Sequence, residues 1–172
     1  MNTFKIDNEI LINTYSNFEK DSEDILFSTD INFIQFHFCL EGKISFRYNN
    51  GSYTLDLKEN NSLILFNPST NLPIDATLQK NTRYLSLLIT IKKFHGLFSE
   101  LTDDISFLSQ ENSDKKYYKE NIISPQISII LNQIINEKLS ENVKNLYLKG
   151  KIFELLGIYF NESNDLNILY FF

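Results

Sequence analysis

A chain of 172 residues, 42% of them hydrophobic and 22% charged, is long enough for one domain with a sizeable core. A net charge of −6 argues against direct nucleic-acid binding, because phosphate contacts need a clustered surplus of Lys and Arg. The single cysteine, Cys39, excludes an intrachain disulfide. There is no secretory h-region and no apolar run of about 20 residues, so we expect a cytoplasmic protein without a membrane partner.

The region 31–57 predicts three consecutive antiparallel strands. The turns fall at Glu41-Gly42 and at Asn49-Asn50-Gly51, where residues that tolerate positive φ sit between alternating apolar residues. The first strand, FIQFHFCL, carries apolar side chains on both faces. A strand of this kind has something packed on each side, so we interpret it as the wall of a barrel or sandwich.

Further short strands are predicted at 8–14, 24–28, 62–66, 77–78 and 83–91, followed by a short helix at 92–101. Local turns between short strands favour an antiparallel barrel or jelly roll. The sequence therefore predicts an α+β protein: a barrel at 1–101, a connecting segment at 102–123, a two-helix hairpin at 124–160 and a tail at 161–172.

The helical hairpin has a clear start. Ser124 is a good N-cap and Pro125 suits the first helical position, before an apolar stripe with helical spacing. The second helix, 143–160, is apolar over more than half its circumference, so it needs the side of the barrel or a second subunit to cover it. We predict a homodimer. The expected interface residues are Leu148, Ile152, Leu155, Leu156 and Tyr159.

Catalytic motifs are absent: there is no nucleophile elbow, no H-E-x-x-H and no phosphate-binding glycine loop. His37, Cys39 and Glu41 alternate along one strand and would share a face, which makes a mixed metal site conceivable. His95 is the only other histidine. Core packing explains these residues better, so we expect no enzyme, no catalytic residue, no metal and no cofactor.

A small-molecule pocket is the remaining kind of site. Aromatic walls with a few polar groups are typical of such pockets, and Arg83 could hold an anionic group. The alternatives are plain core packing and, for Arg83, a surface ion pair. The candidate pocket residues are Phe36, His37, Phe38, Phe46, Tyr48, Phe66 and Arg83.

Two stretches carry a family resemblance: INFIQFHFCLEGKISFRYNN with the later SLILFNPS, and YYKENIISPQISIILNQIIN followed by KNLYLKGKIFELLGIYF. From about residue 30 to 160 the chain resembles the N-terminal sensor region of AraC-type transcription regulators, in the branch that includes regulators of siderophore uptake. The residues that match are Phe36, His37, Phe38, Glu41, Gly42, Asn67, Pro68, Ser124, Pro125, Leu146, Tyr147, Leu148, Lys151, Glu154, Leu155 and Leu156.

The resemblance implies a cupin-like ligand-binding barrel followed by a helical dimerisation and linker element. The two helix-turn-helix units of the family are absent from this sequence, so DNA would be reached only through a domain that this chain lacks. We therefore expect a domain that binds a small-molecule effector, such as a siderophore or another metabolite. A small metal-dependent cupin enzyme, using His37 with Glu41 or His95, and a structural dimer module without a ligand are the alternatives.

Overall fold

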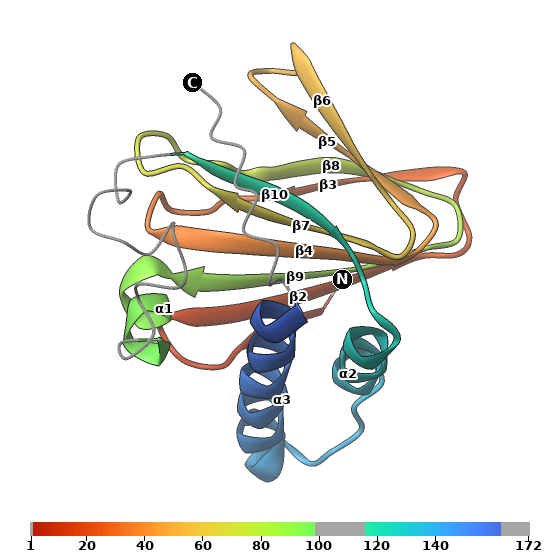
Figure 1. The fold of residues 1–172 in the computed structure, drawn as a ribbon. Helices are drawn as coiled ribbons and strands as arrows, with labels where there is room; N and C mark the ends of the chain where they lie inside the picture. Colours follow the sequence, from red (N-terminus) through yellow and green to blue (C-terminus); the bar gives the residue numbers. More distant parts are fainter. Residues whose placement is uncertain (1, 99–115, 163–172) are drawn as a thin grey trace.

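The computed structural model describes residues 2–98 and 116–162. Within these ranges the chain forms two antiparallel sheets and a layer of helices (Figure 1). The predicted segments at 99–101, 102–115 and 163–172 lie outside the described residues.

The first sheet, called sheet A, has six strands. Their order across the sheet is β1 (Asn2–Lys5), β2 (Ile10–Asn17), β9 (Thr82–Thr90), β4 (Phe33–Glu41), β7 (Asn61–Phe66) and β10 (Tyr117–Ile122). The second sheet, sheet B, has the order β3 (Ser22–Phe27), β8 (Ile74–Gln79), β5 (Lys43–Tyr48) and β6 (Tyr53–Lys58). The strands β4, β5 and β6 are the three predicted in the region 31–57, which confirms that prediction.

Both predicted turns are confirmed, and one of them requires glycine for two reasons. Gly42 has a φ of 73°, and a Cβ at this position would lie 2.6 Å from Oγ1 of Thr82. In the second turn Asn49, Asn50 and Gly51 have φ values of 50°, 54° and 83°. The backbone there closes through a hydrogen bond from the N–H of Gly51 to the carbonyl of Tyr48 (3.1 Å).

Two edge strands, β1 and β10, differ from the prediction. β10 lies in the segment expected to be a connection, and its sequence YYKENI has no apolar alternation. It pairs with β7 along its whole length, from Tyr117 opposite Phe66 to Ile122 opposite Asn61. An edge strand needs only one hydrogen-bonded neighbour, so a strong hydrophobic pattern is not required for it to form.

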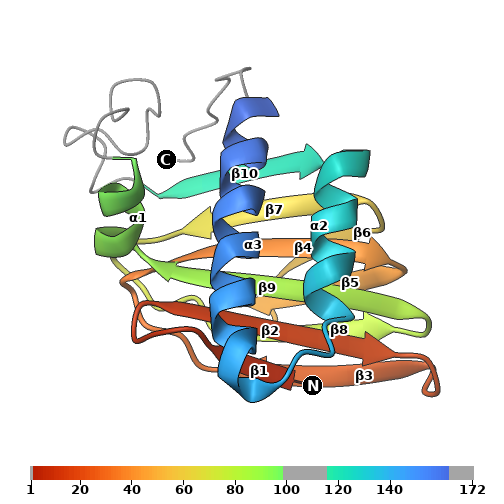
Figure 2. The ribbon, with the colours of Figure 1, turned by 90° about the horizontal axis from the view of Figure 1, so that it is seen from below.

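Residues 2–98 and 116–162 also form three helices: α1 (Ile91–Leu97) before β10, and α2 (Pro125–Ile135) and α3 (Glu141–Glu162) after it. The Ser124 hydroxyl accepts from the N–H of Ile127 at 3.2 Å, as expected for the predicted N-cap. Seen from below, α2 and α3 lie side by side across the face of sheet A that points away from sheet B (Figure 2). The protein is thus α+β, with antiparallel sheets followed by a helical hairpin, as predicted.

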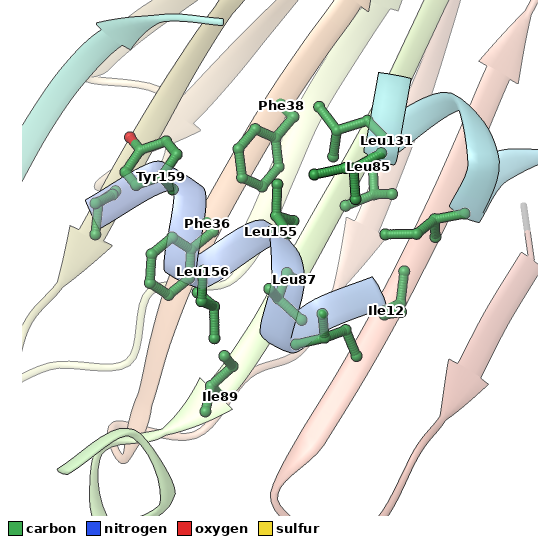
Figure 3. Close-up of a cluster of buried hydrophobic side chains, with 14 of the residues drawn as sticks. Ile12, Phe36, Phe38, Leu85, Leu87, Ile89, Leu131, Leu155, Leu156 and Tyr159 are labelled. Atoms are coloured by element: carbon green, nitrogen blue, oxygen red, sulfur yellow. The ribbon is translucent and has the colours of Figure 1, made fainter. Parts of the chain in front are cut away.

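Sheet A is covered on both faces, which explains its doubly apolar strands. One core, the helix-side core, joins sheet A to the helices and includes Phe36, Leu87 and Leu131 (Figure 3). The other, the inter-sheet core, lies between the sheets and includes Phe46, Leu63 and Leu88. The helix-side core is continuous across the predicted boundary between barrel and hairpin.

The residues predicted to form a dimer interface lie inside the protomer. All five are at most 2% exposed and belong to the helix-side core: Leu148, Ile152, Leu155, Leu156 and Tyr159. The Tyr159 ring, for example, packs edge-on against Phe36 and Phe38, with centroid distances of 6.1 and 5.9 Å. Sheet A of the same chain therefore covers this side of α3, and a second subunit is not needed to bury it.

Candidate functional site

The alternation along β4 divides the predicted pocket residues between two faces. Even-numbered residues such as Phe36 and Phe38 point to the helices, and odd-numbered residues such as His37 and Cys39 point to sheet B. Phe66 also belongs to the helix-side core.

Of the seven predicted residues, three therefore meet between the sheets: His37, Phe46 and Tyr48. Phe36, Phe38 and Phe66 are core residues under the helices, where they cannot contact a ligand held between the sheets. Arg83 lies on the helix-facing side too, paired with Glu41. The two-faced pattern of the strands could not reveal this division, because both faces are equally apolar.

His37 is the centre of a buried hydrogen-bonded network. Its Nδ1 lies 2.5 Å from the Tyr84 hydroxyl, and its Nε2 lies 3.0 Å from Oε1 of Gln35. The Gln35 amide donates to the carbonyl of Leu72 (2.6 Å) and to Oγ1 of Thr29 (3.2 Å). Since Gln35 uses its N–H groups there, its oxygen accepts from Nε2 of His37, and Nδ1 of His37 accepts from the Tyr84 hydroxyl.

Burial keeps the groups of this network neutral. It lowers the pKa of His37 to about 3 and raises the pKa of Tyr84 well above its usual value. Burial also raises the pKa of the Cys39 thiol to about 12. At physiological pH the site is therefore a set of uncharged donors and acceptors in an apolar environment.

Aromatic rings surround this network. His37 packs against Phe46 and Tyr84, with ring centroids 4.8 and 5.9 Å away. Tyr15 stacks on Tyr84 at 5.4 Å, and Tyr48 stacks on Phe46 at 6.4 Å. The result is a continuous series of rings along the space between the sheets.

One hydroxyl group among these rings has no hydrogen-bond partner in the described part of the chain. The Tyr15 oxygen is buried and has no hydrogen-bond partner among the described residues. Burial raises the pKa of Tyr15 to about 12, so the hydroxyl remains a donor. Buried polar groups in folded proteins are nearly always paired, and an unpaired donor in a polar, aromatic environment is a candidate contact for a ligand.

The sequence reading missed Tyr15, Gln35 and Tyr84. A usable signal was present for Gln35, which precedes His37 by two residues on a strand that is otherwise apolar, so the two polar groups had to share a face. Nothing comparable marks the two tyrosines. Their placement depends on the register of β2 and β9 against β4.

The residues of the alternative metal site do not come together on one face of sheet A. β4 has an irregularity between Cys39 and Glu41 that brings Glu41 opposite Arg83, on the other face from His37 and Cys39. His95 belongs to α1, beside Phe94 of the helix-side core. Within residues 2–98 and 116–162 no group of three His, Cys, Asp or Glu side chains is arranged to hold a metal ion.

The site offers directional, neutral hydrogen-bonding groups between aromatic walls. The described residues thus form a β-sandwich with a helical hairpin on the outer face of sheet A and a buried polar network among aromatic rings between the two sheets.

Comparison with known proteins identifies the family. The family model of the regulatory protein PchR N-terminal domain matches residues 21–166, which is most of the chain. The chain belongs to this family, and the resemblance to the N-terminal regulatory region of AraC-type regulators is confirmed. No curated protein sequence matches.

Solved structures show the same fold. Apo ToxT K231A from Vibrio cholerae strain SCE256 matches with a TM-score of 0.56 and 14% identity, over 96% of this chain and 60% of that chain. A second ToxT crystal form from Vibrio cholerae gives a TM-score of 0.50 and 16% identity, with the same coverage. The chain thus spans 60% of the length of the ToxT structures it matches. In the described part of the chain, no helix has both the length and the apolar character needed to cross a membrane.

Proposed function

We propose that this domain is the effector-sensing and dimerising part of an AraC-type transcription regulator, and that the effector binds between the two sheets at Tyr15, His37 and Tyr84. Membership of the PchR N-terminal domain family supports the regulatory role. The main support for the ligand site is the buried Tyr15 hydroxyl, which has no hydrogen-bond partner among the described residues. It lies beside the hydrogen-bonded network of His37 and Tyr84.

The chemistry of the interior limits the effector. No Lys or Arg is among the buried residues of the described part of the chain, and His37 is neutral. A carboxylate or phosphate placed there would be uncompensated, at a cost of several kcal/mol. The proposed effector is therefore a neutral, largely apolar molecule with an acceptor for Tyr15.

Binding has to move packed side chains, because His37, Phe46 and Tyr84 are fully buried. β10 offers a route from this space to the helices. Tyr118 packs toward the inter-sheet core, while Asn121 on the same strand donates to the Tyr159 hydroxyl of α3 at 2.8 Å. An effector that favours one arrangement of these elements changes how α3 presents a DNA-binding unit.

A pair of tyrosine variants tests the ligand site. Tyr15→Phe removes a hydroxyl without a partner, so the melting temperature of the free domain stays the same or rises. The screen uses a library of neutral aromatic and aliphatic fragments, with methyl oleate, oleic acid and ferric salicylate as named members. We expect neutral members to raise the melting temperature of the wild type, and Tyr15→Phe to abolish that rise.

Tyr159→Phe is the matched control, because its hydroxyl is paired and lies on the opposite face of sheet A. It lowers the melting temperature of the free domain but keeps the rise caused by the fragments. The proposal fails if no member of the library stabilises the wild type, or if Tyr15→Phe responds as the wild type does.

The outward side of α3 is the surface that supports dimerisation. Val143, Leu146, Gly150, Phe153 and Gly157 follow one another at steps of three and four, as in the seam of a coiled coil. Leu146 is 76% and Phe153 39% exposed, and the space where Gly150 and Gly157 lack a Cβ is open. In a symmetric pair, Phe153 of one copy fits over the glycines of the other.

Sedimentation of Phe153→Glu tests the dimer. We expect the wild type to be a dimer and this variant a monomer with an unchanged circular dichroism spectrum, because the added charge would be buried only in the dimer. Ile122→Glu is the control, since Ile122 is 81% exposed on β10 and alternates with Asn121, the residue of this strand that faces α3. A monomeric wild type, or a dimeric Phe153→Glu, would show that this surface is not an interface.

A further inference from the structure

A cavity lies on the helix-facing side of sheet A, at the end of α2. It has a volume of about 560 Å³, with Arg83 and Thr14 at its floor and Phe18, Ile135 and Asn136 at its rim. The Arg83 side chain is 18% exposed and Thr14 is 7% exposed, whereas the Phe18 ring is 52% exposed. This cavity is separated from the proposed effector site by the sheet itself.

The floor is built by strand register. Ser16 of β2, Arg83 of β9 and Glu41 of β4 stand directly opposite one another, so they form a row across three strands. The bulge in β4 is what places Glu41, rather than Leu40, in this row. The row puts a cation, an anion and a hydroxyl side by side.

The Arg83–Glu41 pair leaves binding capacity on both partners. One contact joins Nη1 of Arg83 to Oε1 of Glu41 at 2.8 Å. The other guanidinium N–H groups of Arg83 and the second oxygen of Glu41 have no partner among the described residues. A guanidinium fork suits a carboxylate, and a free carboxylate oxygen suits an ammonium group.

The end of α2 adds to the preference for a positive group beside Glu41. The last carbonyls of a helix have no intrahelical donor and carry the negative end of its dipole. α2 ends at Ile135 and is capped by Asn136, and both residues line the cavity. A simple anion would meet Arg83 but also Glu41 and these carbonyls, so a ligand with both charges fits better than one with either alone.

From this arrangement we infer a binding site for a free α-amino acid with an apolar side chain. Its carboxylate lies on the open edge of Arg83. Its ammonium group lies between Glu41 and the end of α2, and its side chain contacts Phe18 and Ile135. The ligand would bridge sheet A and α2, so its occupancy would stabilise the hairpin against the sheet.

Titrations followed by NMR test this inference, with L-phenylalanine as the probe. We expect saturable shifts of the amide signals of Ser16, Arg83 and Asn136. The half-molecules 3-phenylpropionate and 2-phenylethylamine should each bind at least about tenfold more weakly, since each lacks one charged group. D-glucose tests the competing possibility that the polar rim binds a neutral polyol.

Two variants separate the roles of the charges. Arg83→Met should abolish binding of L-phenylalanine. Glu41→Gln should weaken L-phenylalanine about tenfold while strengthening 3-phenylpropionate, because the repelling carboxylate is gone. Lys80→Met is the control, since the Lys80 side chain is exposed and pairs with the exposed Asp21. Thermal unfolding of each variant without ligand shows that it is folded.

The inference is overturned if L-phenylalanine causes no saturable shift up to its solubility limit, if 3-phenylpropionate binds the wild type equally well, or if only D-glucose binds. Fragment binding at Tyr15 is independent of all three results, so this site and the proposed effector site can fail separately.

Discussion

Two leucines on α3 give the sharpest test of how this helix is used. Leu155 is 1% exposed within the helix-side core, and Leu146 is 76% exposed on the outward side. The same substitution, Leu→Ala, can thus be made on both sides of one helix. It removes three carbon groups at about 0.8 kcal/mol each when they are buried, so roughly 2.4 kcal/mol is lost before any cavity forms.

With the cavity term, Leu155→Ala should lower the free energy of unfolding by about 2–5 kcal/mol, a large share of the roughly 5–15 kcal/mol typical of a domain. Leu146→Ala should change the stability of the protomer by less than about 0.5 kcal/mol but weaken the dimer. Urea unfolding followed by circular dichroism measures both.

Protein concentration distinguishes the two effects. The loss caused by Leu155→Ala should be the same over an about fifty-fold range of concentration, because its contacts are intramolecular. The effect of Leu146→Ala should appear only where the wild type is dimeric. If Leu146→Ala destabilised the dilute protein and Leu155→Ala did not, α3 would pack on the sheet by its other side, and the described fold would be refuted.

Three further predictions concern single groups. Tyr159→Phe removes the hydrogen bonds of its hydroxyl to the buried Ser62 and the half-buried Asn121, and should cost about 1–3 kcal/mol of unfolding free energy in urea. An alanine at positive φ costs about 1–2 kcal/mol of unfolding free energy, and this cost applies to both Gly42→Ala and Gly51→Ala. Only the Cβ of Gly42→Ala would also clash with Thr82, so this variant should lose more stability. Equal losses would contradict the close approach of Thr82 to Gly42. Because the pKa of His37 is about 3 when folded and about 6.5 when unfolded, the unfolded chain binds the extra proton between these values. Unfolding free energy should fall by about 1.4 kcal/mol per pH unit as the pH drops from about 6 to about 4, and His37→Gln should flatten this slope.

Elements whose cues are local could be predicted from the sequence. The turn at Asn49 and Asn50 and the start of α2 at Ser124 depend on residues next to each other in the chain, and both were found. β10 was missed because its formation depends on the open edge of β7, distant in sequence. Secondary structure could therefore be predicted from the sequence where interactions between residues close in the chain determine it.

The site was less predictable, because it depends on which way each strand faces. Phe36 and His37 are neighbours in sequence, yet they lie on opposite sides of sheet A. When both sides of a strand are buried, hydrophobicity carries no information on direction. The bulge before Glu41 adds a second uncertainty, since it reverses the face expected from alternation.

The pairing of β10 with β7 also bears on how the chain is made. Translation delivers β7 well before β10, and until then the outer edge of β7 and the helix-facing side of sheet A are exposed. An open strand edge beside apolar side chains is a template for pairing with other chains. Nascent chains of this protein therefore pass through an aggregation-prone stage that ends only when β10, α2 and α3 have left the ribosome, and truncation before Tyr117 should yield insoluble protein.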